Sequence, residues 1–130
     1  LAKSKGCTGI DPDNVDGYGH DTGFPLTKDH SIAFVNWLAS EAHARGLSVG
    51  LKNGIEILPQ VGAQIDFAIN EQCVEYKECS AYKSFLLSGK PVFHVEYSGS
   101  LSSICAVTKP LKISTLKAPL SLNGPSDKCP

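Results

Sequence analysis

The segment Thr8-Gly9-Ile10-Asp11-Pro12-Asp13-Asn14 is a short apolar run that ends in polar and charged residues, and this pattern decides the fold. It recurs three times along the chain, at residues 48–53, 66–71 and 92–97. Polar residues at the ends of successive apolar strands are typical of a parallel α/β sheet, in which the carboxyl ends of the strands form the active-site face. We therefore predict an α/β fold of the (β/α) barrel type, with four polar strand ends in one cleft.

The stretches between these segments predict helices, so strands and helices alternate along the chain. Thr27 can cap a helix over residues 28–45, because apolar residues recur at three- and four-residue spacing and Gly46 follows the run. Trp37 lies in the middle of this helix, and we expect it in the core. The other expected helices cover residues 55–64 (interrupted by Pro59), 81–87 and 101–107, and the expected strands cover residues 8–11, 48–52, 66–70, 91–96 and 111–115, followed by an irregular tail from Leu116.

The composition is that of a globular protein. Of the 130 residues, 42% are apolar and 19% are charged, and the net charge is −1. These values exclude a disordered chain and do not favour a nucleic-acid-binding surface. No apolar run approaches the ~20 residues that a membrane helix requires, so we expect no membrane partner.

The length predicts one domain over residues 1–130, which is too short for a complete (β/α)8 barrel of at least ~200 residues. Residues 1–6 are typical of the last turn of a helix closed by glycine, so we expect an upstream portion of the chain. A partial barrel would leave open sheet edges, through which the chain could self-associate.

The five cysteines favour an oxidising, extracellular location. Cys73 and Cys79 flank a short polar loop, and Cys129 lies in the extreme tail. An odd number leaves one thiol unpaired. Cys7 is the candidate, and we expect it to be buried because it precedes a strand.

The alternation of side chains along a strand predicts which of them face the cleft. We expect the large apolar residues, such as Val49, Leu51, Phe93 and Val95, to meet the outer helices. The inward set is then Asp11, Asp13, Lys52, Asn70, His94 and Glu96, with Glu71 at a strand end where alternation need not hold.

Clustered carboxylates beside a single lysine favour glycoside hydrolysis. A carboxylate next to Lys52 stays ionised and can act as nucleophile or base, whereas another one that lacks a cation can donate a proton. A calcium loop over Asp11, Asp13 and Asp16 is the competing interpretation, but the required glycine and glutamate are absent at the right offsets. The segment Gly17-Tyr18-Gly19 lacks the third glycine of a dinucleotide-binding loop, and we expect no metal and no cofactor.

These residues resemble glycoside hydrolase family 114, the endo-α-1,4-polygalactosaminidase family. The similarity covers nearly the whole chain, and the Asp-Pro-Asp-Asn and Asn-Glu-Gln-Cys pieces, in that order, are specific to it. The segments that carry the similarity are residues 5–16, 44–53, 67–73, 92–97 and 114–117.

The resemblance implies a (β/α)8 TIM barrel, of which this chain would supply about strands 4 to 8. It implies a secreted enzyme of polysaccharide degradation that cleaves α-1,4-galactosaminidic bonds, as in galactosaminogalactan. The catalytic pair would be Asp13 as nucleophile and Glu71 as acid/base, although Asp11 could replace Asp13. A disulfide between Cys73 and Cys79 would close the acidic loop.

The same resemblance suggests the residues that bind the sugar. A cationic galactosamine polymer would be attracted by carboxylates in the cleft, and tyrosines could stack on its rings. The expected substrate-binding residues are Asp11, Asp16, Tyr18, Lys52, Asn70, His94, Glu96 and Tyr97. The alternatives are a non-catalytic carbohydrate-binding derivative, an inactive barrel fragment or, from another class, a small flavodoxin-like domain, which would need a phosphate-binding loop that the sequence lacks.

Overall fold

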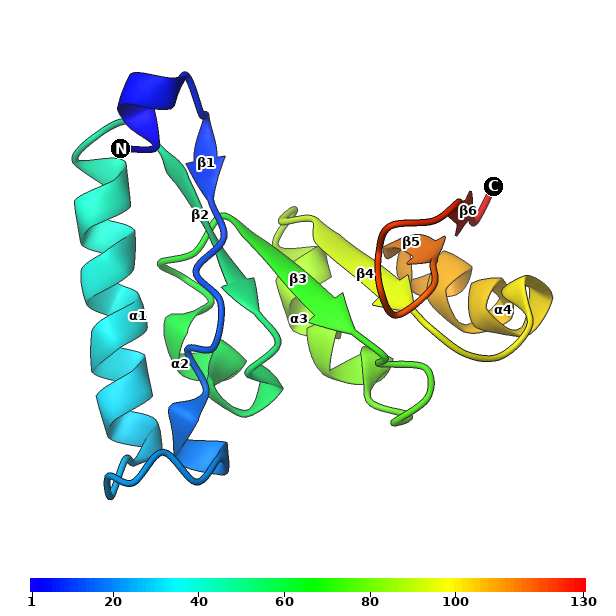
Figure 1. Cartoon of the computed structure of the whole chain (residues 1–130), viewed down its shortest axis with the longest axis horizontal. Coiled ribbons are helices and arrows are strands. Elements are labelled where there is room, and N and C mark those ends of the chain that lie inside the picture. Colours follow the sequence, from blue (N-terminus) through cyan, green and yellow to red (C-terminus); the bar gives the residue numbers. More distant parts are fainter. The chain divides into compact units, whose positions relative to one another are not determined.

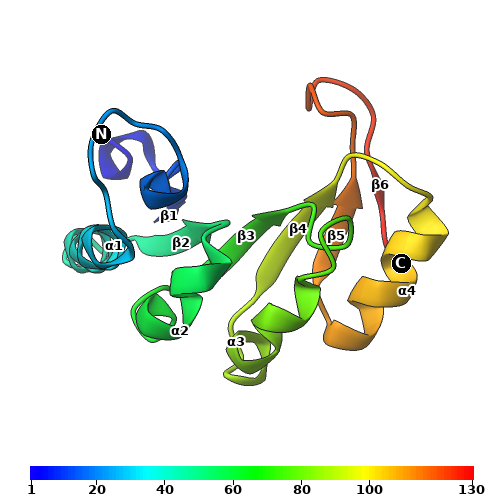
Figure 2. The same ribbon diagram turned by 90° about the horizontal axis from the view of Figure 1, so that it is seen from below.

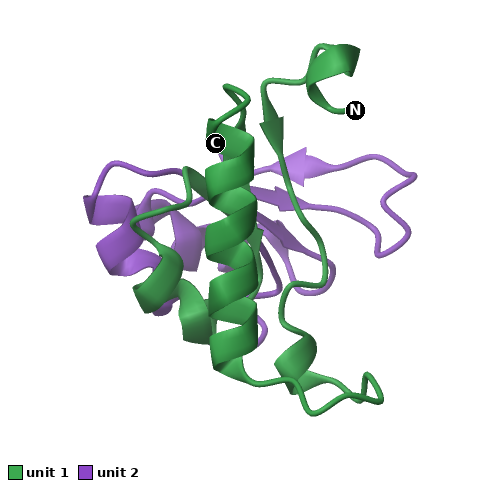
Figure 3. Cartoon of the chain, turned by 90° about the vertical axis from the view of Figure 1, so that its left-hand side faces the viewer, with its two compact units in different colours: residues 1–68 green, residues 69–130 purple.

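A computed structural model describes all 130 residues, and the chain divides into two compact units, residues 1–68 and residues 69–130 (Figures 1 and 3). Each unit is described by itself. No helix in either unit combines the length and the apolar character needed to traverse a lipid bilayer. The expectation of one domain over the whole chain stays a prediction.

Unit 1 is built around a strand–helix–strand motif. Strand β1 (Gly9–Ile10) pairs in parallel with β2 (Ser48–Lys52), and helix α1 (Lys28–His43) connects the two and packs against β2 (Figure 1). The helix begins with a capping box, in which the Thr27 hydroxyl accepts the N–H of His30 and the His30 ring accepts the N–H of Thr27. The predicted helix is therefore confirmed, and it ends two residues earlier than expected.

The core of unit 1 lies where α1 meets β2. Val35, Ala39 and Ala42 of the helix are buried, as are Val49 and Leu51 of the strand. The prediction that Trp37 belongs to this core is wrong, because its side chain is 57% exposed. Two residues turn an α-helix by about 200°, so Trp37 lies on the side opposite Val35 and Ala39. It stacks there on Phe34 with 6.0 Å between ring centroids.

The remaining elements of unit 1 are short. Two 3₁₀ turns cover Lys3–Lys5 and Gly17–Gly19. In place of the helix expected over residues 55–64, a 3₁₀ turn (Ile55–Ile57) leads into helix α2 (Leu58–Val61), which has Pro59 in its first turn. Strand β3 (Phe67–Glu71) begins at the end of this unit.

Unit 2 contains the end of β3, followed by β4 (Val92–Glu96), β5 (Ser114–Lys117) and β6 (Asp127–Lys128) in that order. Strands β4 and β5 are parallel, and β6 is antiparallel to β5. A 3₁₀ turn (Cys79–Tyr82) runs into α3 (Lys83–Leu87), and α4 (Leu101–Leu111) precedes β5. Figure 2 shows α3 and α4 on the same face of these strands.

Three predictions in the last third of the chain are wrong. Helix α4 does not end near residue 107 but continues through Pro110, because a proline in the last turn removes only one hydrogen bond, and Lys112 then ends it with a φ of 61°. The following strand is displaced from residues 111–115 to Ser114–Lys117. The tail, expected to be irregular, contains β6, which covers part of the edge of β5. Self-association through open edges stays a prediction.

Two disulfides close loops of unit 2. One joins Cys73 to Cys79, as expected, and the other joins Cys105 of α4 to Cys129 after β6. Cys7 is the free cysteine, as predicted, but the expectation that it is buried is wrong. It follows a surface 3₁₀ turn and precedes β1, a strand of only two residues, so no packed layer covers it.

Candidate active site

The first candidate catalytic residue, Asp13, lies in unit 1 on the loop that follows β1. Its Oδ1 atom is 3.3 Å from Nζ of Lys52, the last residue of β2. The lysine side chain is only 15% exposed, whereas that of Asp13 is 63% exposed. A mostly buried ammonium group thus holds an accessible carboxylate at the carboxyl ends of two neighbouring strands.

Side-chain alternation in β2 explains this placement. Val49 and Leu51 are buried on the face covered by α1, and Lys52 follows them with the opposite orientation, as predicted. The main chain at Asn14 has a φ of 55°, a left-handed conformation that asparagine tolerates. This residue marks a turn directly after Asp13.

Two other predicted substrate-binding residues lie on the same loop. Tyr18 is in the 3₁₀ turn, and Nζ of Lys28 lies 5.8 Å from the centre of its ring. Lys28 also pairs with Glu56 at 2.8 Å, and burial together with the nearby Glu56 and Asp16 carboxylates raises the pKa of Tyr18. Asp16 is 3.7 Å from the His20 ring. Unit 1 therefore brings Asp11, Asp13, Asp16, Tyr18 and Lys52 onto the loops and strand ends after β1 and β2.

The second candidate catalytic residue, Glu71, is the last residue of β3 and lies in unit 2. The hydroxyl of Tyr97, which directly follows β4, donates a hydrogen bond to its carboxylate. Burial, together with the hydrogen bond and the charge of Glu71, raises the pKa of Tyr97. We expected Tyr97 to stack on a sugar ring. The structure gives it a second role, as the partner of Glu71, for which the sequence carried no signal except its place one residue beyond β4.

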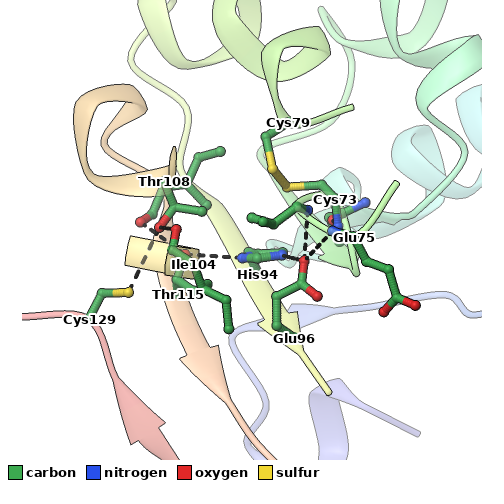
Figure 4. Close-up of a disulfide and its surroundings, with 12 residues drawn as sticks. Cys73, Glu75, Cys79, His94, Glu96, Ile104, Thr108, Thr115 and Cys129 are labelled. Atoms are coloured by element: carbon green, nitrogen blue, oxygen red, sulfur yellow. Dashed lines mark hydrogen bonds and ion pairs between the residues drawn. A yellow bond between two sulfur atoms is a disulfide. The ribbon is translucent and has the colours of Figure 1, made fainter. Parts of the chain in front are cut away.

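The expected inward orientation of Asn70, His94 and Glu96 is wrong. These side chains are almost fully buried, at 1%, 3% and 1% exposure, whereas Phe93, predicted to meet the helices, is 46% exposed. Figure 4 shows the His94 ring between Thr115 of β5 and Glu96, so this side of β4 is turned into the protein. Glu71 and Tyr97 each directly follow one of these buried residues, so their side chains point to the opposite side.

The side chains of these three buried polar residues find their hydrogen-bonding partners within the protein. Oδ1 of Asn70 accepts the N–H of Cys73 at 2.9 Å. Oε1 of Glu96 accepts the N–H groups of Val74 (2.7 Å) and Glu75 (3.2 Å) and lies 3.0 Å from Nε2 of His94 (Figure 4). They have no surface to offer to a sugar, so we withdraw them from the substrate-binding set.

The difference between the predicted and the observed orientation of these side chains has a physical cause. Hydrogen bonds from loop amides make it possible to bury a carboxylate or an amide at low cost, so polarity alone does not identify the cleft-facing side of a strand. Alternation fixes only which residues share a side, and in β4 the shared side of His94 and Glu96 is the buried one.

The disulfide lies beside this network and bears on metal binding. The sulfur atoms of Cys73 and Cys79 and a ring nitrogen of His94 lie within 4.8 Å of one another, which is close enough for a metal site. The two sulfurs are bonded to each other, and both His94 nitrogens have hydrogen-bonding partners, Thr115 and Glu96. In the oxidised protein this group is therefore a structural cluster, since metal ligation by cysteine needs a free thiolate.

Parallel strands that are joined by helices and end in partnered carboxylates define an α/β protein with acidic groups at its strand ends. All 130 residues match the model of glycoside-hydrolase family GH114. The chain belongs to this family. No curated protein gave a significant match.

Three solved structures resemble the chain, and two of them are the PelA domain and a variant of it. The crystal structure of Aspergillus fumigatus Ega3 in complex with galactosamine has 43% sequence identity and a TM-score of 0.91, and the match covers 98% of this chain and 56% of Ega3. The glycoside hydrolase domain of PelA from Pseudomonas aeruginosa has 13% identity and a TM-score of 0.70, and the match covers 96% of this chain and 58% of that domain. The chain thus spans little more than half the length of either structure. The predicted α/β fold, as part of the family's barrel, is confirmed.

Proposed function

We propose that this chain is part of a glycoside hydrolase that cleaves α-1,4-galactosaminidic bonds, with Asp13 and Glu71 as the catalytic carboxylates. The observation that carries the proposal is the contrast between their surroundings. Asp13 is next to an ammonium group, and Glu71 is next to a phenolic hydroxyl, in a chain that matches GH114 throughout. Two carboxylates with different surroundings are what glycoside hydrolysis requires.

The surroundings of the two acids support different catalytic roles for them. Lys52 holds the accessible carboxylate of Asp13 at 3.3 Å, and a carboxylate fixed in this way suits a nucleophile. The hydroxyl of Tyr97 can donate to either protonation state of Glu71, because a protonated carboxyl group keeps one oxygen free to accept, and this suits a residue that acts first as acid and then as base. Asp11, on the same loop as Asp13, remains the alternative to it.

Charge supports a cationic substrate. Asp11 and Asp13 are exposed and Asp16 is half-buried, all on the loop after β1, and unacetylated galactosamine carries an ammonium group near neutral pH. The bound galactosamine named for Ega3, at 43% identity, points to the same sugar. The two disulfides favour secretion, where such a polymer would be encountered.

The test is turnover of an α-1,4-linked galactosamine polymer, measured as new reducing ends. Because the chain spans 56% of Ega3, it is assayed alone and within the full-length protein. Asp13→Asn and Glu71→Gln should each abolish release while leaving polymer binding and the unfolding midpoint near normal. Asp21→Asn, at an exposed aspartate of the same long loop, is the control and should keep full turnover.

Each outcome decides between hypotheses. Near-normal rates in Asp13→Asn or Glu71→Gln would remove that residue from its role. Polymer binding without any release by the full-length protein would replace the hydrolase proposal with the non-catalytic carbohydrate-binding one.

A further inference from the structure

The loop at residues 72–79, which directly follows Glu71, is closed by a disulfide and hydrogen-bonded to β4. Its ends are joined by the Cys73–Cys79 disulfide, and the N–H of Glu78 donates to the carbonyl of Cys73 at 2.8 Å. The N–H of Gln72 donates to the carbonyl of Val95 at 2.9 Å. Glu71 is therefore followed by a segment that is fixed to β4 from its first residue.

The centre of this attachment is the buried carboxylate of Glu96. It receives the N–H groups of Val74 and Glu75 and lies within hydrogen-bonding distance of the His94 ring. Glu96 is 1% exposed, and a carboxylate is buried this deeply only when several donors compensate for lost water. All three donors named here converge on the same oxygen, so the loop cannot shift without leaving that oxygen short of donors.

His94 in turn fixes the direction of the Glu96 side chain. Its other nitrogen, Nδ1, lies 3.1 Å from the Thr115 hydroxyl of β5. Burial lowers the pKa of His94, although Glu96 opposes this, and the neutral ring can donate from Nε2 to Glu96 while Nδ1 accepts from Thr115. A chain of hydrogen bonds thus runs from β5 through β4 to the loop (Figure 4).

We propose that Glu96, oriented by His94, is a positioning residue that sets the place of Glu71 by fixing the loop behind it. Glu96 and Tyr97 are consecutive, and their side chains leave the end of β4 in opposite directions. Glu96 holds the loop after Glu71, and Tyr97 holds the Glu71 carboxylate itself. The end of β4 therefore fixes both the main chain and the side chain of one proposed catalytic acid. This inference rests on the proposed function for its consequence in catalysis.

The experiment compares Glu96→Leu and Glu96→Gln with Glu75→Gln, a matched control. Leucine has a similar size and no acceptor, whereas glutamine keeps one acceptor oxygen. Glu75 lies in the same loop with its side chain in solvent, and glutamine there keeps an acceptor for Gln72 and Ser98. The measurements are amide hydrogen exchange at Val74 and Glu75, the titration of Tyr97 followed by NMR of its labelled ring, and kcat with KM on the galactosamine polymer.

Glu96→Leu should speed the exchange of both amides about tenfold or more, because two charge-assisted hydrogen bonds are lost. The pKa of Tyr97 should fall, since Glu71 no longer lies against it. Misplacement of a catalytic group by about 1 Å should lower kcat by roughly 100-fold with KM changed by less than about twofold. Glu96→Gln should give intermediate values, and Glu75→Gln should match the unmodified protein.

Two results would overturn the inference. One is exchange at Val74 and Glu75 that does not change in either variant of Glu96. The other is faster exchange with an unaltered Tyr97 titration, which would show that the loop is released while Glu71 stays in place. If Glu96→Leu does not fold, Glu96→Gln provides the same comparison. The exchange and the Tyr97 titration do not depend on turnover, so failure of the hydrolase proposal, seen in Asp13→Asn and Glu71→Gln, is distinguished from failure of this one.

Discussion

Removing the Tyr97 hydroxyl tests the proposed role of Glu71 most directly. The change is Tyr97→Phe, which keeps the ring and deletes the hydrogen bond that Tyr97 donates to Glu71. A hydroxyl donor stabilises an ionised carboxylate more than a protonated one. In the variant, protonation of Glu71 becomes easier, so the limb of the pH–rate profile that Glu71 controls should move to higher pH.

The size of the movement follows from the hydrogen bond. A bond to a charged group contributes about 1.5–3 kcal/mol, and each 1.36 kcal/mol corresponds to one pH unit, which gives a shift of about 1 to 2 units. Tyr97 is only half-buried, and partial access of water weakens the bond. We therefore expect a shift of about 1 unit, at the lower end of this range.

The assay is kcat/KM for the galactosamine polymer across pH in the full-length protein. If Glu71 donates the proton to the leaving group, the limb that moves is the alkaline one, because the protonated form is the active one and now persists to higher pH. If Glu71 is instead the nucleophile, the acidic limb moves. The control is Tyr76→Phe, at a tyrosine of the same loop that is 62% exposed. Profiles of Tyr97→Phe and the control that superimpose would refute the reasoning.

Two further predictions concern stability. Replacing Cys105 and Cys129 with alanine should lower the free energy of unfolding more than replacing Cys73 and Cys79, because the disulfides have sequence separations of 24 and 6 residues. Loop-closure entropy predicts losses of about 3.4 and 2.2 kcal/mol, respectively. Urea denaturation would measure both losses. In the second, burial lowers the pKa of His94 below its ordinary value of 6.5, so the unfolded chain binds a proton that the folded chain does not. The free energy of unfolding should then rise with pH between the lowered pKa of folded His94 and 6.5, and fall on acidification through the same range. His94→Gln should reduce this pH dependence in unfolding measurements.

Each stability prediction has its own control and contrary result. His20→Gln changes a histidine whose side chain is 65% exposed and should leave the slope as it is. An unaltered slope in His94→Gln would show that His94 is not the titrating group. An equal loss of stability from the two disulfides, or the reverse order, would show that strain or residual structure in the unfolded chain outweighs loop closure.

Much of the fold could be read from local patterns. The capping residue Thr27, the apolar spacing after it and Gly46 place α1 to within two residues. The strand at residues 48–52 was predicted with the observed bounds. The predicted helix at residues 101–107 was too short and the strand after it was placed too early, because the helix continues through Pro110 until Lys112 adopts a left-handed conformation. Local rules place such boundaries poorly when the penalty of a residue depends on its position in the helix.

Part of the candidate site could likewise be predicted from local patterns, and part could not. Asp13 and Lys52 were predicted to share a face, and the structure pairs them at 3.3 Å. Tyr97 was recognised as part of the site, but its contact with Glu71, 26 residues earlier in the chain, was not. Such a pairing depends on two strands and a loop being in register, and neither residue carries a local sign of it.

The alternation of strands and helices, the positions of the acids at strand ends and the family could all be predicted without a structure, because each of these depends on neighbouring residues or on a short motif. Tertiary contacts were needed to establish that His94 and Glu96 lie on the buried side of β4, and that Cys105 is the partner of Cys129. The physical reason is that a strand specifies two sides but not which one is covered. That choice is made by the donors that reach a buried carboxylate, and these come from a loop more than 20 residues away.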